Sequence, residues 1–200
     1  MIKAIVFDYG GVITSGGAGN ELAVRLAQDL DISVDQASEL TFGPWPEYIK
    51  GRIDEEEYWR RVETQYGHSI PSNKRMIWNT WGHMSPRDEM LDFVKQLKSQ
   101  GYTVGLLSNV IPNTEKDIRA HGVYDLFQPC ILSCQVGFAK PEPAIYQVLL
   151  QQLPGIEAEE IIFVDDQERC LKPARELGIN CVMADKPGQI TAGVNKLLKK

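Results

Sequence analysis

Residues 2–13 read IKAIVFDYGGVI, and this stretch decides the fold of the chain. The residues before Asp8 are mostly apolar and β-favouring, whereas the Tyr9-Gly10-Gly11 sequence after it would not continue a regular strand. An apolar run without alternation predicts a strand that is covered on both faces, as in a parallel sheet. Such sheets carry their functional groups just beyond the carboxyl ends of the strands, so we expect Asp8 to lie in a functional site.

The size and charge of the chain narrow the class of protein. Its 200 residues, 43% of them hydrophobic, are enough for one domain, or one domain with a small insert, around a substantial core. The net charge of -6 and the lack of a Lys/Arg stripe argue against nucleic-acid and membrane partners. The sequence shows neither a basic, apolar leader nor a membrane-length apolar run, so we expect a cytoplasmic protein.

The four cysteines are irregularly spaced and contain no Cys-x2-Cys pair that would predict a zinc site. We expect Cys130, Cys134, Cys170 and Cys181 to be free thiols.

Residues 15–83 carry no strand signal and predict about four helices. The first helix has Leu22, Leu26, Ala27 and Leu30 on one face, and the last runs from Asn73 to Trp81. Between them, Ser33 and Gln36 predict a capping box, and Asp54 predicts the N-cap of a helix that ends near Gly67. Two prolines and a glycine within residues 42–46 are expected to exclude regular structure there.

After residue 84, helical and strand patterns alternate. Ser85 is expected to cap a helix with Pro86 at its first position. The expected strands are then Tyr102–Leu107, Cys130–Leu132, Ile161–Val164 and Asn180–Met183, and the expected helices are Asn113–His121, Glu142–Leu153, Glu168–Leu177 and a last one from about Gly188. This alternation predicts an α/β fold, a Rossmann-like doubly wound parallel sheet.

The predicted core domain comprises residues 1–14 and 84–200, and an α-helical domain of residues 15–83 is inserted after the first strand. An insert at that point stands over Asp8, so its natural use is a lid with hinges near residues 15–19 and 82–85. The alternative is that the inserted domain is held rigidly on the core and does not move as a lid.

Four polar sites each follow an apolar strand and are expected to meet in one cluster: Asp8, Ser108-Asn109, Lys140-Pro141 and Asp165-Asp166. At these residues the chain resembles the haloacid dehalogenase superfamily, the phosphoaspartate hydrolases. FDYGGVI is similar to its first motif, LLSN to its second, GFAKPEPAIY to its third and IIFVDDQERC to its fourth. The order and spacing hold across the whole chain, and residues 15–83 match the small helical cap of the family.

The residue types make chemical sense at such a site. Asp8 is ionised at neutral pH and can act as a nucleophile without a base. Its attack on a phosphate needs positive charge nearby, and paired acids suit Mg2+. The expected metal ligands are Asp8 and Asp166, with Asp165 as a ligand or supporting partner, and the resemblance adds the backbone carbonyl of Gly10. Lys140 supplies further positive charge, while Ser108, Asn109, Gly10 and Gly11 are expected to hold the phosphoryl group.

Simpler explanations exist for several of these residues. Asp166 could cap the helix at Glu168, and Ser108 could cap the helix near Asn113. The aromatic residues of the insert are expected to form its core: Trp45, Tyr48, Trp59, Trp78 and Trp81. Trp45 and Tyr48, with Lys50 and Arg52 close behind, are also the candidates for contact with the substrate.

The resemblance implies a Mg2+-dependent phosphatase that acts on a small phosphorylated metabolite, such as a sugar phosphate, through an aspartyl-phosphate intermediate. The chain departs from the family at Gly10, where most of these phosphatases have an aspartate that protonates the leaving oxygen. Loss of such an acid typically costs about 10²- to 10⁴-fold in rate, least for good leaving groups such as the anomeric oxygen of a sugar 1-phosphate. At this motif the sequence resembles a branch of the family that reads Asp-x-Gly-Gly/Asn-Val and includes sugar-phosphate phosphatases.

Two alternatives remain. The dehalogenase branch needs no metal, has a tyrosine two residues after the nucleophile and lacks the paired acids, whereas here Tyr9 comes one residue too early and Asp165-Asp166 is present. The other alternative is a catalytically weak protein that binds a phosphorylated ligand or a partner protein. The sequence leaves a monomer and a homodimer equally open.

Overall fold

A parallel sheet forms the centre of the computed structural model, which describes residues 1–16, 21–75, 85–184 and 186–199. Within these residues the sheet has five strands in the order β3-β2-β1-β4-β5. They are β1 (Ala4–Phe7), β2 (Thr103–Ser108), β3 (Cys130–Leu132), β4 (Ile161–Asp165) and β5 (Asn180–Met183). The central strand β1 pairs on one side with β2 and on the other with β4, so that Phe7 aligns with Leu106 and Val164. The predicted doubly wound α/β fold is confirmed.

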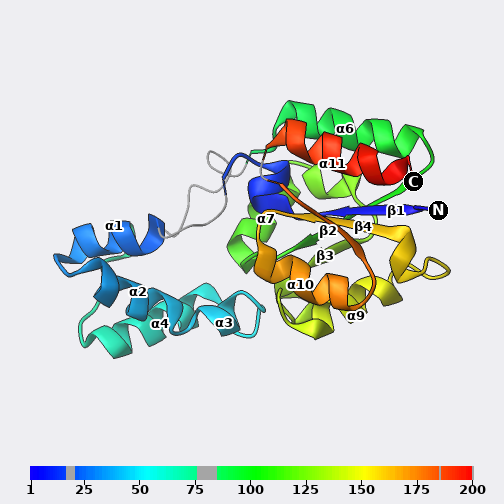
Figure 1. Cartoon of the computed structure of the whole chain (residues 1–200). Coiled ribbons are helices and arrows are strands. Elements are labelled where there is room, and N and C mark those ends of the chain that lie inside the picture. Colours follow the sequence, from blue (N-terminus) through cyan, green and yellow to red (C-terminus); the bar gives the residue numbers. More distant parts are fainter. Residues whose placement is uncertain (17–20, 76–84, 185, 200) are drawn as a thin grey trace.

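Helices cover both faces of the sheet (Figure 1). Ile5 and Phe7 point into an apolar cluster with α6 (Asp88–Ser99) and α11 (Pro187–Leu198), whereas Ala4 and Val6 belong to a second cluster with α9 (Pro143–Gln151) and α10 (Glu168–Glu176). Because β1 is covered on both faces, every one of its side chains is buried. This two-sided burial is the physical reason for the unbroken apolar run in the sequence.

The remaining core elements are the helical turn Tyr9–Ile13, α7 (Pro112–Ala120), the short helix α8 (Ser133–Val136) and the single turns Val123–Leu126 and Ala158–Glu160. The start of α6 differs from the prediction. Its N-cap is Arg87, so the prediction that Ser85 caps the helix with Pro86 at its first position is wrong. The Arg87 N–H donates to the Ile13 carbonyl (2.9 Å) and Pro86 forms a bridge with Thr14, which keeps this backbone extended before the helix.

The helical insert (residues 15–83) contains α1 (Glu21–Leu30), α2 (Val34–Phe42), α3 (Trp45–Tyr48), α4 (Glu55–Tyr66) and the turn Ser72–Lys74. The capping box of Ser33 and Gln36 is confirmed, as are the Asp54 N-cap and the end of α4 at Gly67. The predicted break at residues 42–46 is present only at Gly43 and Pro44, because α2 ends at Phe42 and α3 begins at Trp45. Its prolines fall at the cap and first turn, where a helix needs no N–H donor.

An apolar cluster of its own lies inside the helical insert. Tyr58 and Trp59 of α4 are buried in it, and the Tyr48 ring stacks on Tyr58 with ring centroids 4.8 Å apart. Ile111, which follows β2, is the core residue that joins this cluster. Trp78 and Trp81, most of the predicted helix Asn73 to Trp81, and most of both predicted hinges lie outside the described residues.

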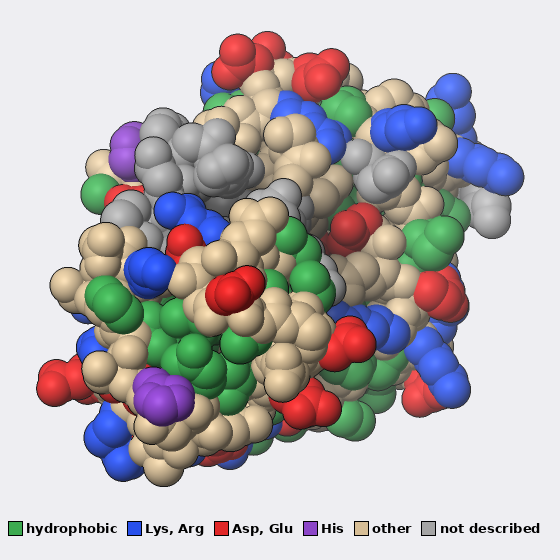
Figure 2. Space-filling model, turned by 90° about the vertical axis from the view of Figure 1, so that its left-hand side faces the viewer, with side chains coloured by type: hydrophobic (Ala, Val, Ile, Leu, Met, Phe, Trp, Pro, Cys, Tyr) green, Lys and Arg blue, Asp and Glu red, His purple; other side chains and the backbone are tan. Residues whose placement is uncertain are grey.

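The surface that faces the viewer in Figure 2 shows Lys and Arg side chains interspersed with Asp and Glu side chains among the described residues. The four cysteines are free thiols, as expected. Among the helices of the described ranges, none combines the length and the apolar character needed to cross a bilayer.

Candidate active site

Asp8 is placed by the end of β1. Its N–H donates to the Val164 carbonyl (2.9 Å), which extends the strand pairing by one residue. The chain then turns, and the turn closes with a hydrogen bond from the Thr14 N–H to the Tyr9 carbonyl (3.0 Å). The Tyr9 side chain packs into the core against Tyr124, so only the carboxylate of this stretch is left at the end of the strand. Asp8 is 7% exposed.

Lys140 connects two of the three predicted acids. Its Nζ lies 2.9 Å from Asp8 Oδ1 and 2.6 Å from Asp165 Oδ2, and it stands 5.4 Å from the centre of the Phe163 ring. Burial by itself lowers the pKa of Lys140, but the charges of Asp8 and Asp165 outweigh burial and hold the pKa above its ordinary value. The ammonium is therefore a permanent positive charge in the site.

The surroundings of Asp8, unlike those of Lys140, disfavour the charged form of the side chain. Burial raises the pKa of Asp8 to about 6, since the pull of Lys140 compensates only part of the cost of desolvation and the charge of Asp165 adds to it. Its Oδ1 accepts hydrogen bonds from the Tyr9 N–H (2.6 Å) and from Lys140, and neither bond involves Oδ2. Asp8 is mostly ionised at neutral pH.

Asn109 holds the main chain of Lys140. Its Nδ2 donates to the Lys140 carbonyl (2.8 Å), and its Oδ1 accepts from the Lys140 N–H (2.7 Å). The sequence predicted that Asn109 contacts a phosphoryl group; the structure places both polar atoms of its carboxamide on Lys140. Ser108, at the end of β2, is buried beside it.

The two acids after β4 have different surroundings. Asp165 is fully buried and both its oxygens are engaged, Oδ2 by Lys140 and Oδ1 by the Gln167 N–H (2.8 Å). Asp166 Oδ1 is buried and has no hydrogen-bond partner among the described residues. Burial and the neighbouring Asp165 raise the pKa of Asp166. The N-cap of α10 is Gln167, so Asp166 is not the cap of that helix.

Oxygen atoms of Asp8, Asp165 and Asp166 lie within 4.8 Å of one another. Three carboxylates with a single lysine leave an excess of negative charge, and the buried Asp166 Oδ1 lacks a donor. A hard divalent cation satisfies both conditions, because Mg2+ prefers carboxylate oxygens and keeps several waters. The residues present fit the predicted Mg2+, with Asp8 and Asp166 as the better placed acids.

The two glycines after Tyr9 differ in what the backbone requires of them. Gly11 has a φ of 74°, and a Cβ on it would lie 2.4 Å from Asp166 Oδ2. Gly10 has φ -68° and ψ 131°, which any residue adopts. The backbone therefore explains Gly11 and does not explain Gly10.

The two predicted substrate residues of the helical insert, Trp45 and Tyr48, both belong to its apolar cluster, as expected for core residues. Tyr48 is fully buried in the cluster of the insert, whereas Trp45 is partly exposed and packs edge-on against Phe42 and Tyr58. Sequence reasoning missed Ser133 and Glu142. The side chain of each contacts both the helical insert and a core segment next to Lys140 or Asn109. Glu142 lies two residues after Lys140 in the quoted third motif, which was the available signal.

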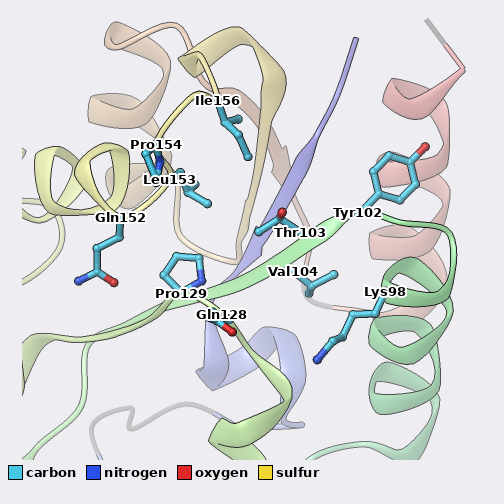
Figure 3. Close-up of a pocket in the computed structure, with 10 residues that line it drawn as sticks. All are labelled: Lys98, Tyr102, Thr103, Val104, Gln128, Pro129, Gln152, Leu153, Pro154 and Ile156. Atoms are coloured by element: carbon cyan, nitrogen blue, oxygen red, sulfur yellow. The ribbon is translucent and has the colours of Figure 1, made fainter.

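A separate hollow of about 400 Å³ lies at the opposite end of β2. Figure 3 shows Thr103 and Val104 of β2 in its wall, together with Pro129 and Leu153. None of the residues of the candidate active site contributes to its lining.

A family model described as haloacid dehalogenase-like hydrolase matches residues 2–178, and the chain belongs to this family. Among known relatives, bifunctional epoxide hydrolase 2 of Sus scrofa is 28% identical over 207 residues, which cover 91% of this chain and 36% of that protein. The chain thus spans only about a third of that relative. D-ribitol-5-phosphate phosphatase of Bacteroides thetaiotaomicron is 27% identical over 190 residues, with 89% of each protein covered.

A solved structure is also similar over nearly its full length. It is a HAD family enzyme from Bacteroides thetaiotaomicron in complex with magnesium and inorganic phosphate. The TM-score is 0.74 and the identity 25%, with 94% of this chain and 96% of that chain covered. The comparisons confirm the family expected from the four motifs.

The space beside Gly11 gives a test of the proposed metal ligand. We expect Gly11→Ala to weaken Mg2+ binding at least about 10-fold, because the new Cβ would displace the Asp166 carboxylate, and to cost about 1–2 kcal/mol of stability at a positive φ. Calorimetric titration with Mg2+ and urea denaturation measure the two effects. Gly188→Ala, where a Cβ meets open space, is the control. Unchanged Mg2+ binding in Gly11→Ala would mean that Asp166 is not a metal ligand.

The burial of Asp8 gives a pH-dependent prediction. In EDTA at pH 7.5 we expect the free energy of unfolding of Asp8→Asn to be about 1–3 kcal/mol higher than that of the wild type, because a buried carboxylate is replaced by a neutral group. The pKa of about 6 lies above the ordinary value of 3.8, so the folded wild type gains a proton, and stability, as the pH falls through 6. The advantage of the variant should therefore shrink toward pH 4.

Urea denaturation of both proteins between pH 4 and about pH 8 checks this. A variant that is less stable than the wild type at pH 7.5 would mean that the ion pair with Lys140 outweighs the burial of Asp8.

Proposed function

We propose that the chain is a Mg2+-dependent phosphatase that acts on a small phosphorylated metabolite through an aspartyl-phosphate on Asp8. The observation that supports this best is the contact of Lys140 Nζ with Asp8 (2.9 Å) and Asp165 (2.6 Å) beside the unpartnered oxygen of Asp166. The named phosphatase among the relatives and the magnesium and phosphate of the similar structure agree with it.

In the proposed first step, a carboxylate oxygen of Asp8 attacks phosphorus, the bond to the leaving oxygen breaks and an aspartyl-phosphate forms. In this proposal Lys140 offsets the charge of the incoming phosphate, and the hydroxyl of Ser108, which is buried, donates to a phosphoryl oxygen. Water then attacks phosphorus in the second step, which releases phosphate and restores Asp8. Asn109 acts indirectly here, since it holds Lys140.

Asp8 and Asp166, with the Gly10 carbonyl, would hold Mg2+. The ion supplies charge neutralisation and orients the phosphoryl group when bound. Gly10 offers no side chain to protonate the leaving oxygen, so the proposed substrates are those with a weakly basic leaving group, such as sugar 1-phosphates, aryl phosphates and acyl phosphates.

The division into a core of residues 1–14 and 84–200 and a cap of residues 15–83 is part of this proposal. It is supported by the separate apolar cluster of the helical insert. Of the two aromatic candidates for substrate contact, we favour Trp45, because it is partly exposed whereas Tyr48 is buried in the cluster of the insert.

One observation favours a second function. Gly10 adopts a backbone conformation open to any residue, so its lack of a side chain is not imposed by its φ and ψ angles. A protein that binds a phosphorylated ligand and turns it over slowly would not need the missing acid.

We expect Mg2+-dependent release of phosphate from p-nitrophenyl phosphate or sugar phosphates, and a loss of at least about 10³-fold in Asp8→Asn, because the nucleophile is gone. Phosphate assays with and without EDTA measure both. Lys172→Ala is a suitable control, since Lys172 lies on α10 outside the site. Tight ligand binding without turnover would favour the second function, and metal-independent halide release from a 2-haloacid would contradict both.

The missing acid can be restored by Gly10→Asp. We expect kcat on alkyl phosphates to rise by about 10²-fold, because an alkoxide needs a proton, and kcat on p-nitrophenyl phosphate to change much less. The ratio of the two rates is the readout, so a general loss of folded protein does not affect it. An equal change on both substrates would show that proton donation does not limit the natural protein.

A further inference from the structure

Four consecutive residues of the helical insert, which we name the docking turn (residues 49–52), contact the core segment that carries Lys140. The Ile49 carbonyl accepts a hydrogen bond from Ser133 Oγ (2.7 Å). Gly51 approaches the Cys134 carbonyl so closely that a Cβ would lie 2.1 Å from that oxygen.

The two charged residues of the docking turn reach the same segment. Arg52 Nη2 donates to the Gly137 carbonyl (3.2 Å), and Lys50 Nζ lies 2.5 Å from Glu142 Oε1. The Lys50 side chain is 12% exposed, whereas the Glu142 side chain is 39% exposed. Water therefore screens this ion pair mainly from the side of Glu142.

Glu142 holds the turn that contains Lys140. Its N–H donates to the Ala139 carbonyl (2.8 Å), and its Oε2 accepts from the Ala139 N–H (3.0 Å). Lys140 and Pro141 are the central residues of this turn. Because Lys50 binds the other oxygen of the same carboxylate, the helical insert and the Lys140 turn share one side chain.

A second connection runs through Ser133. Its Oγ accepts from the Val110 N–H (2.9 Å) while it donates to Ile49. Val110 directly follows Asn109, which binds the main-chain N–H and carbonyl of Lys140. The docking turn therefore contacts Glu142 directly and is connected to Asn109 through Ser133 and Val110.

We propose that Lys50 is a positioning residue that acts through Glu142 on the turn Ala139–Glu142 and so holds the Lys140 ammonium between Asp8 and Asp165. The consequence for turnover rests on the proposed function, whereas the mechanical coupling does not. Lys50 is not a substrate-binding cation in this view, because its ammonium is bound to Glu142. Its loss should lower kcat through misplacement of Lys140 rather than weaken substrate binding.

The experiment compares Lys50→Met, Lys50→Arg and Glu142→Gln with the wild type, and Arg60→Met is the matched control, since Arg60 pairs with Glu57 within α4. Amide exchange at Ala139 and Lys140 is followed by NMR in metal-free protein. In Lys50→Met we expect exchange about 10-fold faster at both amides, kcat on p-nitrophenyl phosphate about 10-fold lower and KM within about 2-fold. Lys50→Arg should keep most of the wild-type protection from exchange and most of the wild-type kcat. The double variant Lys50→Met/Glu142→Gln should have a kcat no lower than that of Glu142→Gln alone.

Unchanged exchange at Ala139 and Lys140 in Lys50→Met would overturn the proposal, as would a rise in KM at constant kcat or additive losses in the double variant. A wild type without phosphatase activity would refute the proposed function alone. The exchange rates would then still decide whether Lys50 holds the Lys140 turn, with faster exchange in support and unchanged exchange against.

Discussion

The candidate active site is organised around a buried lysine between two carboxylates. Lys140 lies within 3 Å of Asp8 and Asp165, and these three side chains are almost completely removed from solvent. Burial of charges costs more free energy than their attraction readily returns, so such a cluster is weak evidence of a stabilising role. Here the arrangement keeps Lys140 charged and leaves Oδ1 of Asp166 without a donor, which agrees with the proposed attack of Asp8 on a phosphate.

Sheet topology brings these groups together. Because β1 lies between β2 and β4, the residues that follow these strands meet at one edge of the sheet, although Asp8 and Asp165 are far apart in sequence. Lys140 comes from the loop after β3 and reaches the acids because Asn109, at the end of β2, holds its main chain. The helical insert leaves the core directly after β1 and returns to the same edge through the docking turn.

Gly10 and Gly11 show that neighbouring glycines can have unrelated causes. A positive φ and the nearby Asp166 carboxylate exclude a side chain at Gly11, whereas the backbone at Gly10 would accept one. The glycine at position 11 is therefore required by its surroundings, whereas the dihedral angles at position 10 do not require one. The Lys50–Glu142 pair adds a further dependence, since the position of a core lysine then rests in part on a contact from the insert.

The sequence by itself determined the elements whose signals are local. The apolar run of β1, the capping box of Ser33 and the N-cap of Asp54 depend on neighbours in the chain, and the order of the motifs placed Asp8, Lys140, Asp165 and Asp166 at one edge. Only the tertiary structure decided the rest. Helix α6 starts late because Pro86 and Arg87 pair with Ile13 and Thr14, and Asn109 and Lys50 found partners far away in the chain. Such hydrogen bonds join residues tens of positions apart, and no local pattern encodes them.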